Sequence, residues 1–289
     1  MPSPTALSSR SVAITGAGGG LGREIALGLA AKGYAVFGTG MSDAEVRELK
    51  DASAGRVRLT ICDMTQEAAV QSWVDGVSDA LGDAGLDILI NNAGILTPGP
   101  IEVLPLDAIR REFDVNVFGA LSVINAFLPA LRKARGRIVQ VSTWTASVAL
   151  PFNGPSGASK AAMEVFAAVY RAELKSFGID VVVAPAGNMK TGGPAKTASA
   201  LARVSNDMTV EQRALYGPAF DTFATTLNGM QSNGLDAVSA AKRVIDLAEQ
   251  MPAPSRAAVG PDAEQMLKAA REKSDAELDA LRLRIVGLD

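Results

Sequence analysis

The chain of 289 residues contains no histidine and one cysteine, Cys62. Without histidine, it cannot form a Ser-His-Asp or Cys-His nucleophile system, and it cannot bind zinc through histidine. A single cysteine excludes an internal disulfide and is typical of a reducing compartment; at the end of an apolar run, we expect it to be buried. Acid–base chemistry must therefore fall to Lys, Tyr, Asp or Glu, and we predict no metal site.

Strong charge and long hydrophobic runs are also lacking. The net charge is −3, which argues against a nucleic acid as the main partner. The sequence shows no run of 18 apolar residues and no basic and apolar leader, so we expect a cytoplasmic protein without a membrane span. Hydrophobic residues make up 48% of the chain, which is enough for one large α/β domain over residues 1–289.

A glycine-rich stretch at residues 15–22 is the first feature that points to a ligand. A short apolar run at 12–14 precedes it, and apolar residues with helical spacing follow it. Its spaced glycines are Gly16, Gly20 and Gly22. This spacing is neither the common dinucleotide fingerprint nor a P-loop. Bare amides at a strand–loop–helix junction bind anions, so we predict a phosphate cradle; a glycine-rich turn without a ligand is the alternative.

Strand-like and helix-like segments alternate along the chain. We expect strands at 12–14, 35–37, 57–61, 86–90, 137–141 and 180–184. We expect helices at 23–32, 42–50, 66–81, 107–133, 155–177 and 236–251. This alternation predicts an α/β fold with a doubly wound, Rossmann-like parallel sheet covered on both faces. Ligands bind such sheets at the carboxyl ends of the strands, near the switch in strand order.

Local signals refine this picture. Ser42 and Glu45 are spaced as a capping box, and Pro129 should bend its helix or begin a separate segment. Residues 190–234 are predicted to form an excursion or lid with short helices on the substrate side, with a surface insertion as the alternative. A last strand is expected at 257–259 and one amphipathic C-terminal helix at 262–285. No linker separates a second domain.

Small and polar residues follow the expected strands. Residues 91–94 follow the fourth strand, Thr143 follows the fifth, and Gly187 and Thr191 follow the sixth. Because the carboxyl ends of parallel strands share one edge, these residues are candidates for one ligand site. Residues 91–94 alone are also compatible with a simple turn.

Three further residues complete the pattern. Asn116 interrupts an apolar helical segment, which favours a buried hydrogen-bonding role over a solvated one. Ser156 follows Thr143 by 13 residues, and Lys160 lies four residues later. The order and spacing of all these motifs over about residues 10–192 resemble the short-chain dehydrogenase/reductase family. Residues 151–155 and the C-terminal extension are most similar to its retinol- and hydroxysteroid-dehydrogenase-like branch.

The resemblance implies hydride transfer between NAD or NADP and an alcohol or ketone. The implied cofactor-binding residues are Gly16, Gly19, Gly20, Leu21, Gly22, Asp63, Met64, Asn91, Ala93, Gly94, Lys160, Gly187 and Thr191. In the family, residues at the positions of 16–22 hold the pyrophosphate, and those at 63–64 contact adenine. The positions of 91–94 line the adenosine ribose and nicotinamide side, and that of Thr191 bonds the carboxamide.

The implied catalytic residues are Asn116, Thr143, Ser156 and Lys160. In the family, Lys160 would bind the nicotinamide ribose and lower the pKa of the acid–base. Asn116 would position a water that links Lys160 to solvent. Thr143 replaces the usual serine but keeps a hydroxyl for a substrate carbonyl, and Ser142 beside it should point the opposite way.

Position 156 departs from the family, which has its catalytic tyrosine there. A phenol starts with a pKa near 10 that a nearby ammonium can lower, whereas a serine hydroxyl is far less acidic and sits closer to the backbone. We therefore expect cofactor binding to survive and hydride transfer to be attenuated or disabled. The serine is either a deliberate replacement of tyrosine or native to a divergent member.

Two other functions are kept open. One is a dinucleotide-binding pseudoenzyme or sensor, which requires Ser156 to be native. A Ser–Lys hydrolase is the remote alternative, because Ser156 and Lys160 lie one helical turn apart. That function would leave the cofactor motifs without a purpose.

The choice between NAD and NADP rests on three neutral positions. Gly40 stands where NAD-preferring members have an acid, and Met41 and Gly19 stand where NADP-preferring members have a base. No carboxylate at these positions repels a 2′-phosphate and no arginine selects it, so NADP is slightly preferred.

Substrate and assembly are predicted from composition. Met and Phe side chains in the 190–234 excursion suggest an apolar alcohol or ketone. A small, apolar helix face predicts a homodimer or homotetramer, with packing on the sheet as the alternative; its residues are Ala158, Ala161, Ala162, Val165 and Phe166.

Overall fold

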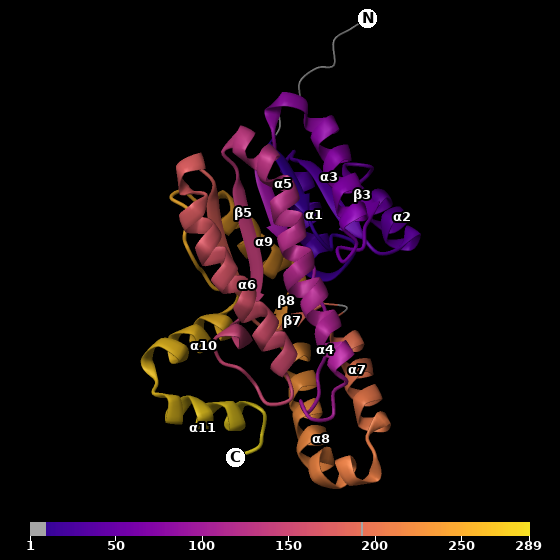
Figure 1. Cartoon of the computed structure of the whole chain (residues 1–289), viewed down its shortest axis with the longest axis vertical. Coiled ribbons are helices and arrows are strands. Elements are labelled where there is room, and N and C mark those ends of the chain that lie inside the picture. The colour runs from indigo at the N-terminus through magenta and orange to yellow at the C-terminus, as the bar shows by residue number, and fades with distance from the viewer. Residues whose placement is uncertain (1–9, 192) are drawn as a thin grey trace, which may run out of the picture.

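The computed structural model describes residues 10–191 and 193–289 and is built on one parallel sheet (Figure 1). Six strands lie in the order β3-β2-β1-β4-β5-β6. The strands are β1 (Ser11–Ile14), β2 (Ala35–Gly40), β3 (Val57–Ile61), β4 (Ile88–Asn91), β5 (Arg137–Thr143) and β6 (Asp180–Ala186). The strand order reverses between β1 and β4, so the predicted doubly wound fold is confirmed.

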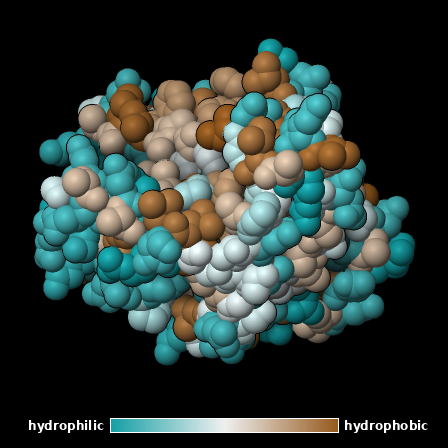
Figure 2. Space-filling model, turned by 90° about the horizontal axis from the view of Figure 1, so that it is seen from below, coloured by the Kyte–Doolittle hydropathy of each residue, from teal (hydrophilic) through white to brown (hydrophobic). Residues whose placement is uncertain are grey.

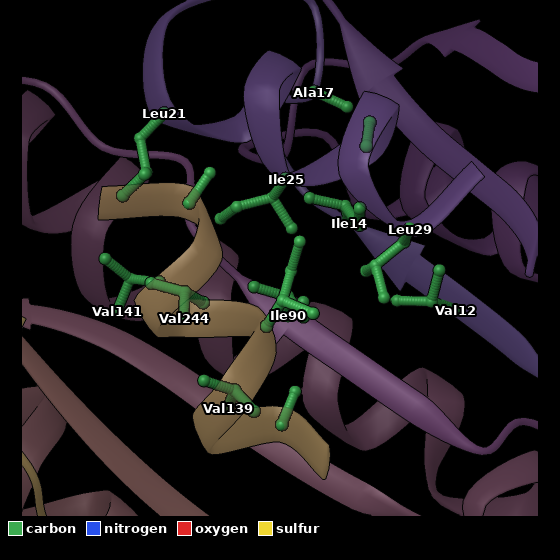
Figure 3. Close-up of a cluster of buried hydrophobic side chains, with 14 of the residues drawn as sticks. Val12, Ile14, Ala17, Leu21, Ile25, Leu29, Ile90, Val139, Val141 and Val244 are labelled. Carbon is green, nitrogen blue, oxygen red and sulfur yellow. The ribbon is translucent and has the colours of Figure 1, made fainter. Parts of the chain in front are cut away.

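Helices cover both faces of this sheet. One face carries α1 (Gly20–Ala31) and α9 (Ala237–Glu249). The other face carries α3 (Glu67–Leu81), α5 (Ala120–Ala134) and α6 (Gly154–Glu173). Strands that are buried on both faces need continuous apolar runs rather than alternation, as the sequences of β1, β4 and β6 show. Figure 3 shows the first core, where Val244 of α9 lies near Ile90 and Val141 of the sheet.

The helical stretch expected at 107–133 spans 106–134 in the structure. It consists of α4 (Leu106–Phe113), a π-helical segment (Asp114–Gly119) and α5. Pro129 lies inside α5 and starts no separate segment. By length and composition this stretch could cross a membrane, but half of its most apolar window is buried in the fold. Val123 and Phe127 of this stretch are fully buried in the core under α3 and α6.

The sequence predicted short helices in residues 190–234, and this prediction is wrong. These residues form a helical hairpin of α7 (Gly193–Asp207) and α8 (Val210–Ser232), which extends below the sheet in Figure 1. A two-stranded pairing of β7 (Met189–Lys190) with β8 (Leu235–Asp236) closes its base. A third apolar cluster joins the hairpin to the loop after β5, with Phe152 edge-on to Phe220 and Phe223.

The C-terminal region also differs from the expectation. The single helix predicted at 262–285 is two helices, α10 (Pro261–Glu272) and α11 (Asp275–Ile285). The break occurs because Ser274 and Glu277 form a reciprocal capping box that starts a new helix. Residues 257–259 follow β6 through isolated bridges and do not form a strand. Viewed from below, this end of the molecule carries several separate hydrophobic areas among hydrophilic ones (Figure 2).

The remaining elements agree closely with the bounds expected from the sequence. The helix α2 (Asp43–Ala52) is N-capped by Ser42, whose hydroxyl accepts a bond from Glu45 N as predicted. The Glu45 carboxylate accepts from Met41 N, so the expected second half of the capping box is replaced. Cys62 is buried at the end of β3. The helix expected at 155–177 ends at 173 and is followed by a short 3₁₀ turn, Lys175–Phe177.

Candidate active site

The loops after β1 and β4 are fastened to each other at the switch in strand order. Thr15 N donates to Ile90 O at 3.0 Å. The Thr15 hydroxyl accepts from Asn92 N at 2.9 Å and from Ala93 N at 3.0 Å. The glycine-rich loop and the segment 91–94 therefore form one rigid edge, as expected for a site at the switch point.

Close backbone approaches explain the glycines of this loop. Gly16 has φ +67°, and a Cβ there would lie 3.1 Å from Ala93 Cα. A Cβ at Gly22 would collide with Gly16 O. Gly20 has φ +54° and faces Thr191, which directly follows Met189–Lys190; a Cβ built on Gly20 would lie 3.8 Å from Thr191 Cβ. The glycine-rich loop therefore extends from β1 to Thr191, the residue predicted to bond the carboxamide of the nicotinamide.

The start of α1 is suited to an anion. Its N-cap, Gly19, makes no side-chain cap bond, and no acidic residue stands in the first turn. Leu21 is buried and anchors this turn in the core. Helix N-termini with bare amides attract phosphate groups, so the residues present fit a dinucleotide diphosphate.

Asn91 lies at β4 but points away from the edge. Its side chain is buried and donates to Ala120 O and Gln140 Oε1, both at 3.4 Å. It therefore ties β4 to β5 and α5. Its contact with a ribose stays a prediction, and the backbone of Ala93 is better placed at the edge.

Asp63 and Met64 follow β3, next to the end of β2. Cys62 N donates to Gly40 O at 3.0 Å, which joins the two strand ends. Asp63 accepts from the backbone N–H and the hydroxyl of Thr65, and these bonds hold its pKa below the ordinary range. Met64 is buried, so only its backbone is offered to a ligand. The predicted adenine contacts are compatible with this placement and remain untested.

Lys160, Asn116 and Gly94 converge at the opposite end of the groove. A Cβ at Gly94 would lie 3.0 Å from both Asn116 Oδ1 and Lys160 Nζ. Asn116 is buried, accepts from Ile95 N at 2.8 Å and donates to Ser159 Oγ at 3.0 Å. Since the side chain is engaged in these bonds, its predicted role in holding a water remains a prediction.

The buried carboxyl of Glu112 supplies the electrostatics around Lys160. Glu112 is fully buried, and its carboxyl accepts from Thr97 N at 2.8 Å and from Asn116 Nδ2 at 3.3 Å. Burial raises the pKa of Glu112 to about 7, against the hydrogen bonding to Thr97 and the charge of Lys160. Burial lowers the pKa of Lys160, while the carboxylates of Glu112 and Glu164 act to raise it. The ammonium is thus poised to exchange a proton more readily than an exposed lysine.

Replacing Glu112 with Gln tests this burial. The pKa of Glu112 in the folded state, about 7, lies above the ordinary 4.5. The contribution of Glu112 to the unfolding free energy is therefore fully present below pH 4.5, where the carboxyl is protonated in both states. It is lost as the pH rises through 7. Between these limits, the unfolding free energy of the parent protein relative to E112Q should fall by roughly 3 kcal/mol, at about 1.4 kcal/mol per pKa unit. Urea titrations across this range measure the effect, and a difference that is constant with pH contradicts it.

Thr143, Ser156 and Lys160 meet on the wall of one cavity of about 220 Å³. Thr143 ends β5, and its oxygen accepts from Thr145 N at 3.3 Å. Ser156 lies in the first turns of α6 and is buried. The other lining residues are Leu96, Trp144, Thr145, Leu150, Asn153, Gly187, Asn188, Met189, Thr191, Thr197, Leu227, Met230 and Gln231. The structure thus brings together residues from β5, α6, the segment after β6 and the α7–α8 hairpin.

Ser142 points away from this cavity, as the alternation along β5 predicts. Its hydroxyl donates to Glu164 Oε1 at 2.6 Å, and Glu164 also pairs with Arg256 at 2.7 Å. Burial raises the pKa of Glu164, while these two partners act to lower it. Of the two neighbouring hydroxyls, only that of Thr143 is offered to a ligand.

Asp262 explains the glycine at position 187. The Asp262 carboxylate accepts from Asn188 N at 2.8 Å and from Asn188 Nδ2 at 3.1 Å. A Cβ at Gly187 would collide with this carboxylate. The loop after β6 is therefore held in place by α10, a contact that no spacing in the sequence revealed.

Gly187→Ala should displace Asp262 and leave the Asn188 donors without their acceptor. We expect a loss of about 1–3 kcal/mol in unfolding free energy, because a Cβ in the space of the Asp262 carboxylate forces a shift and the half-buried Asn188 donors lose their partner. Gly229→Ala is the matched control, because nothing lies within 4 Å of a Cβ there and the position is inside α8. Thermal unfolding of both variants measures the difference; equal stabilities would contradict this account.

The three tyrosines lie elsewhere. The phenols of Tyr34, Tyr170 and Tyr216 donate to Glu249, Asn125 and Glu102, respectively. None of them lines the cavity in the described part of the chain. Across residues 10–191 and 193–289, no group of three or more Cys, Asp or Glu side chains is placed to hold a metal ion.

Two amides of the cavity wall are residues that the sequence did not single out. Asn153 is the N-cap of α6 but makes no side-chain cap bond. Its Oδ1 and Gln231 Oε1 are buried, and neither has a hydrogen-bond partner among the described residues. The only signal for Asn153 was its position three residues before Ser156. No sequence signal pointed to Gln231, because it reaches the cavity wall only through the position of α8 in the fold.

Comparison with known proteins agrees with this geometry. Residues 10–201 match the family model of short chain dehydrogenases. Mouse estradiol 17-beta-dehydrogenase 2 is 34% identical over 189 residues, which cover 64% of this chain and 49% of that protein. Mouse retinol dehydrogenase 16 is 33% identical over 217 residues, 74% of this chain and 68% of that protein. This chain thus spans about half the length of the estradiol dehydrogenase.

Solved structures share the fold at lower identity. A short-chain dehydrogenase from Streptomyces avermitilis superimposes with a TM-score of 0.78 at 24% identity, over 98% of this chain and 99% of that one. A Burkholderia cenocepacia short chain dehydrogenase in complex with NADP gives 0.71 at 23% identity, over 97% and 99%. An NAD⁺-bound xylitol dehydrogenase gives 0.72 at 23% identity, over 88% and 98%. With its glycine loop at the switch point and its match over residues 10–201, this chain belongs to the short-chain dehydrogenase/reductase family.

Proposed function

We propose that the protein is an NAD(P)-dependent oxidoreductase that interconverts an alcohol and a ketone, with activity attenuated by Ser156. The observation that carries this proposal is the cavity in which Thr143, Ser156 and Lys160 meet, beside the edge formed by residues 15–22 and 91–94. Relatives named as estradiol and retinol dehydrogenases support this reaction class. Structures of the same fold that hold NADP or NAD⁺ support the cofactor class.

The chain offers a residue for each part of such a dinucleotide. Residues 16–22 would hold the diphosphate on the amides at the start of α1. Lys160 would donate to the hydroxyls of the nicotinamide ribose, and Thr191, after β7, faces the glycine-rich loop at Gly20. When bound, the nicotinamide would supply or accept the hydride at the cavity wall.

Thr143 and Lys160 would carry the protein's part of the reaction. The Thr143 hydroxyl would donate to the substrate oxygen, because its own oxygen already accepts from Thr145. Lys160 would hold positive charge near the developing alkoxide, and its lowered pKa favours release of a proton. Ser156 would be a poor acid because an aliphatic hydroxyl does not ionise near neutral pH. These roles predict turnover that is slow but measurable.

The cavity suggests the substrate class. Its walls are apolar at Leu150, Leu227 and Met230, which supports the predicted apolar alcohol or ketone. Asn153 and Gln231 add two buried amides without partners among the described residues. Because a buried amide left unpaired costs about 1–3 kcal/mol, a substrate with a second polar group is favoured over a pure hydrocarbon chain.

A substrate panel tests the proposed function. The protein would be assayed with NAD⁺ and NADP⁺ against secondary alcohols, each in a form with and without a second hydroxyl. We expect slow formation of reduced nicotinamide, faster with the diol of each pair. Tight dinucleotide binding with no turnover in this protein or in its Ser156→Tyr variant would favour the sensor function instead.

Self-association is proposed from one face of α6. Of the face predicted for subunit packing, Val165 and Phe166 are 65% and 40% exposed, as is the nearby Val169 at 47%, whereas Ala162 packs against the core. An exposed apolar row of this kind favours a homodimer or homotetramer. Light scattering that shows a monomer at assay concentrations would contradict this.

A further inference from the structure

A carboxylate lies at the end of β2, although the strand itself ends in glycine. Glu45 is on the first turn of α2, and its Oε2 accepts from Met41 N at 2.6 Å. A Cβ at Gly18 would lie 2.5 Å from this oxygen, and a Cβ at Gly40 would lie 2.8 Å from it. The carboxylate thus fills the space that two missing side chains leave open, between the glycine loop and β2.

This is the place where a dinucleotide-binding sheet meets the adenosine ribose. In such folds the diphosphate rests on the loop after β1, and an acidic residue about 20 positions further on bonds the ribose 2′-hydroxyl. Glu45 follows Gly22 by 23 residues. Gly40, at the usual position of that acid, has no side chain, and Glu45 reaches the same space from the neighbouring helix.

We infer that Glu45 is the ribose-binding acid of this protein and selects NAD over NADP. This rests on the proposed dinucleotide-dependent function and reverses the slight preference for NADP drawn from Gly40, Met41 and Gly19. A carboxylate accepts hydrogen bonds from ribose hydroxyls and repels a 2′-phosphate. Its bond to Met41 N also occupies a backbone donor that the phosphate would otherwise use.

Two arginines of the neighbouring elements α1 and β3 are directed elsewhere. Arg23 of α1 pairs with Glu24 at 2.8 Å. The Arg58 guanidinium lies over the Phe37 ring at 5.4 Å. Phe37 belongs to the core on the α3 side of the sheet, whereas Gly38 and its neighbour Leu59 face α1. Neither arginine therefore offsets the negative charge at Glu45.

Calorimetry with matched ligands tests the inference. NAD⁺ is compared with NADP⁺, and 5′-AMP with 2′,5′-ADP, which differ in the same phosphate. We expect the parent protein to bind NAD⁺ at least about tenfold more tightly than NADP⁺, and Glu45→Gln to reduce this ratio by about tenfold. Glutamine keeps an acceptor for Met41 N, so the helix start is retained. Glu48→Gln, an exposed change on the same helix, should leave the ratio unaltered.

The outcomes separate this inference from the proposed function. A parent protein that binds both dinucleotides equally, or NADP⁺ more tightly, overturns the role of Glu45 and leaves the oxidoreductase proposal intact. An unchanged ratio in Glu45→Gln, with unfolding as in the parent, also overturns it. If neither dinucleotide binds, the proposed function fails and the inference fails with it.

Discussion

Replacing Ser156 with tyrosine is expected to raise kcat for hydride transfer by about 10²–10⁴, the usual contribution of a positioned acid–base. Position 156 lies on the cavity wall, one helical turn before Lys160, so a phenol there would stand near the ammonium and Thr143. The ammonium would lower the pKa of the phenol from about 10 towards neutrality. Serine at this position offers neither the reach nor the acidity.

Ser156→Phe is the control for this gain. Phenylalanine adds the ring without the hydroxyl, so any benefit of filling the cavity appears in both variants. Reduced nicotinamide, followed by its absorbance with a secondary alcohol, reports the rate. Equal rates for the tyrosine and phenylalanine variants, with dinucleotide bound to both, would mean that the site does not use a phenol.

Lys160→Met is expected to lower kcat/KM by about 10²–10³, the range seen when a preorganised electrostatic partner is removed. Lys160 is the residue at which the groove and the cavity meet, through Gly94 and Ser156. The change also removes a charge that holds down the pKa of Glu112, so that pKa should rise further above 7. Stability should change little below pH 7, where Glu112 is protonated and Glu164 keeps its ion pair with Arg256, so that no unpaired buried charge is left.

The matched control is Lys175→Met, which removes an exposed lysine after α6. Stopped-flow binding of the dinucleotide and steady-state kinetics separate binding from turnover. If Lys160→Met keeps full kcat/KM, the proposed role of the ammonium is wrong. A stability loss as large as the loss expected for Gly187→Ala would point to a structural role instead.

The central sheet could be predicted because its signals are local. The apolar runs of β1, β4 and β6 are continuous, that of β5 is interrupted by Gln140, and glycines mark the turn at residues 15–22. Thr143 was a candidate because it follows a strand, and Lys160 because of its spacing from Thr143 and Ser156. The structure then brings them to one cavity wall, as the shared edge of a parallel sheet requires.

Contacts between distant segments could not be predicted. Glu112 lies in an amphipathic helix whose charges are expected to face solvent, yet tertiary packing buries it below Asn116. Gln231 and Asp262 reach the site only because the α7–α8 hairpin and α10 fold back towards β6. Glu45 looked like half of a capping box, and its carboxylate turned instead to Met41 N. Local propensity carries no information on such placements.

A crystal structure of the protein grown with NAD⁺ tests the central claim most directly. The dinucleotide should lie across the carboxyl edge of the sheet, with its diphosphate on the amides of residues 19–22 and its nicotinamide ribose bonded to Lys160 Nζ. A groove that stays empty at millimolar NAD⁺ and NADP⁺, or a nucleotide bound away from the loop after β1, would contradict it.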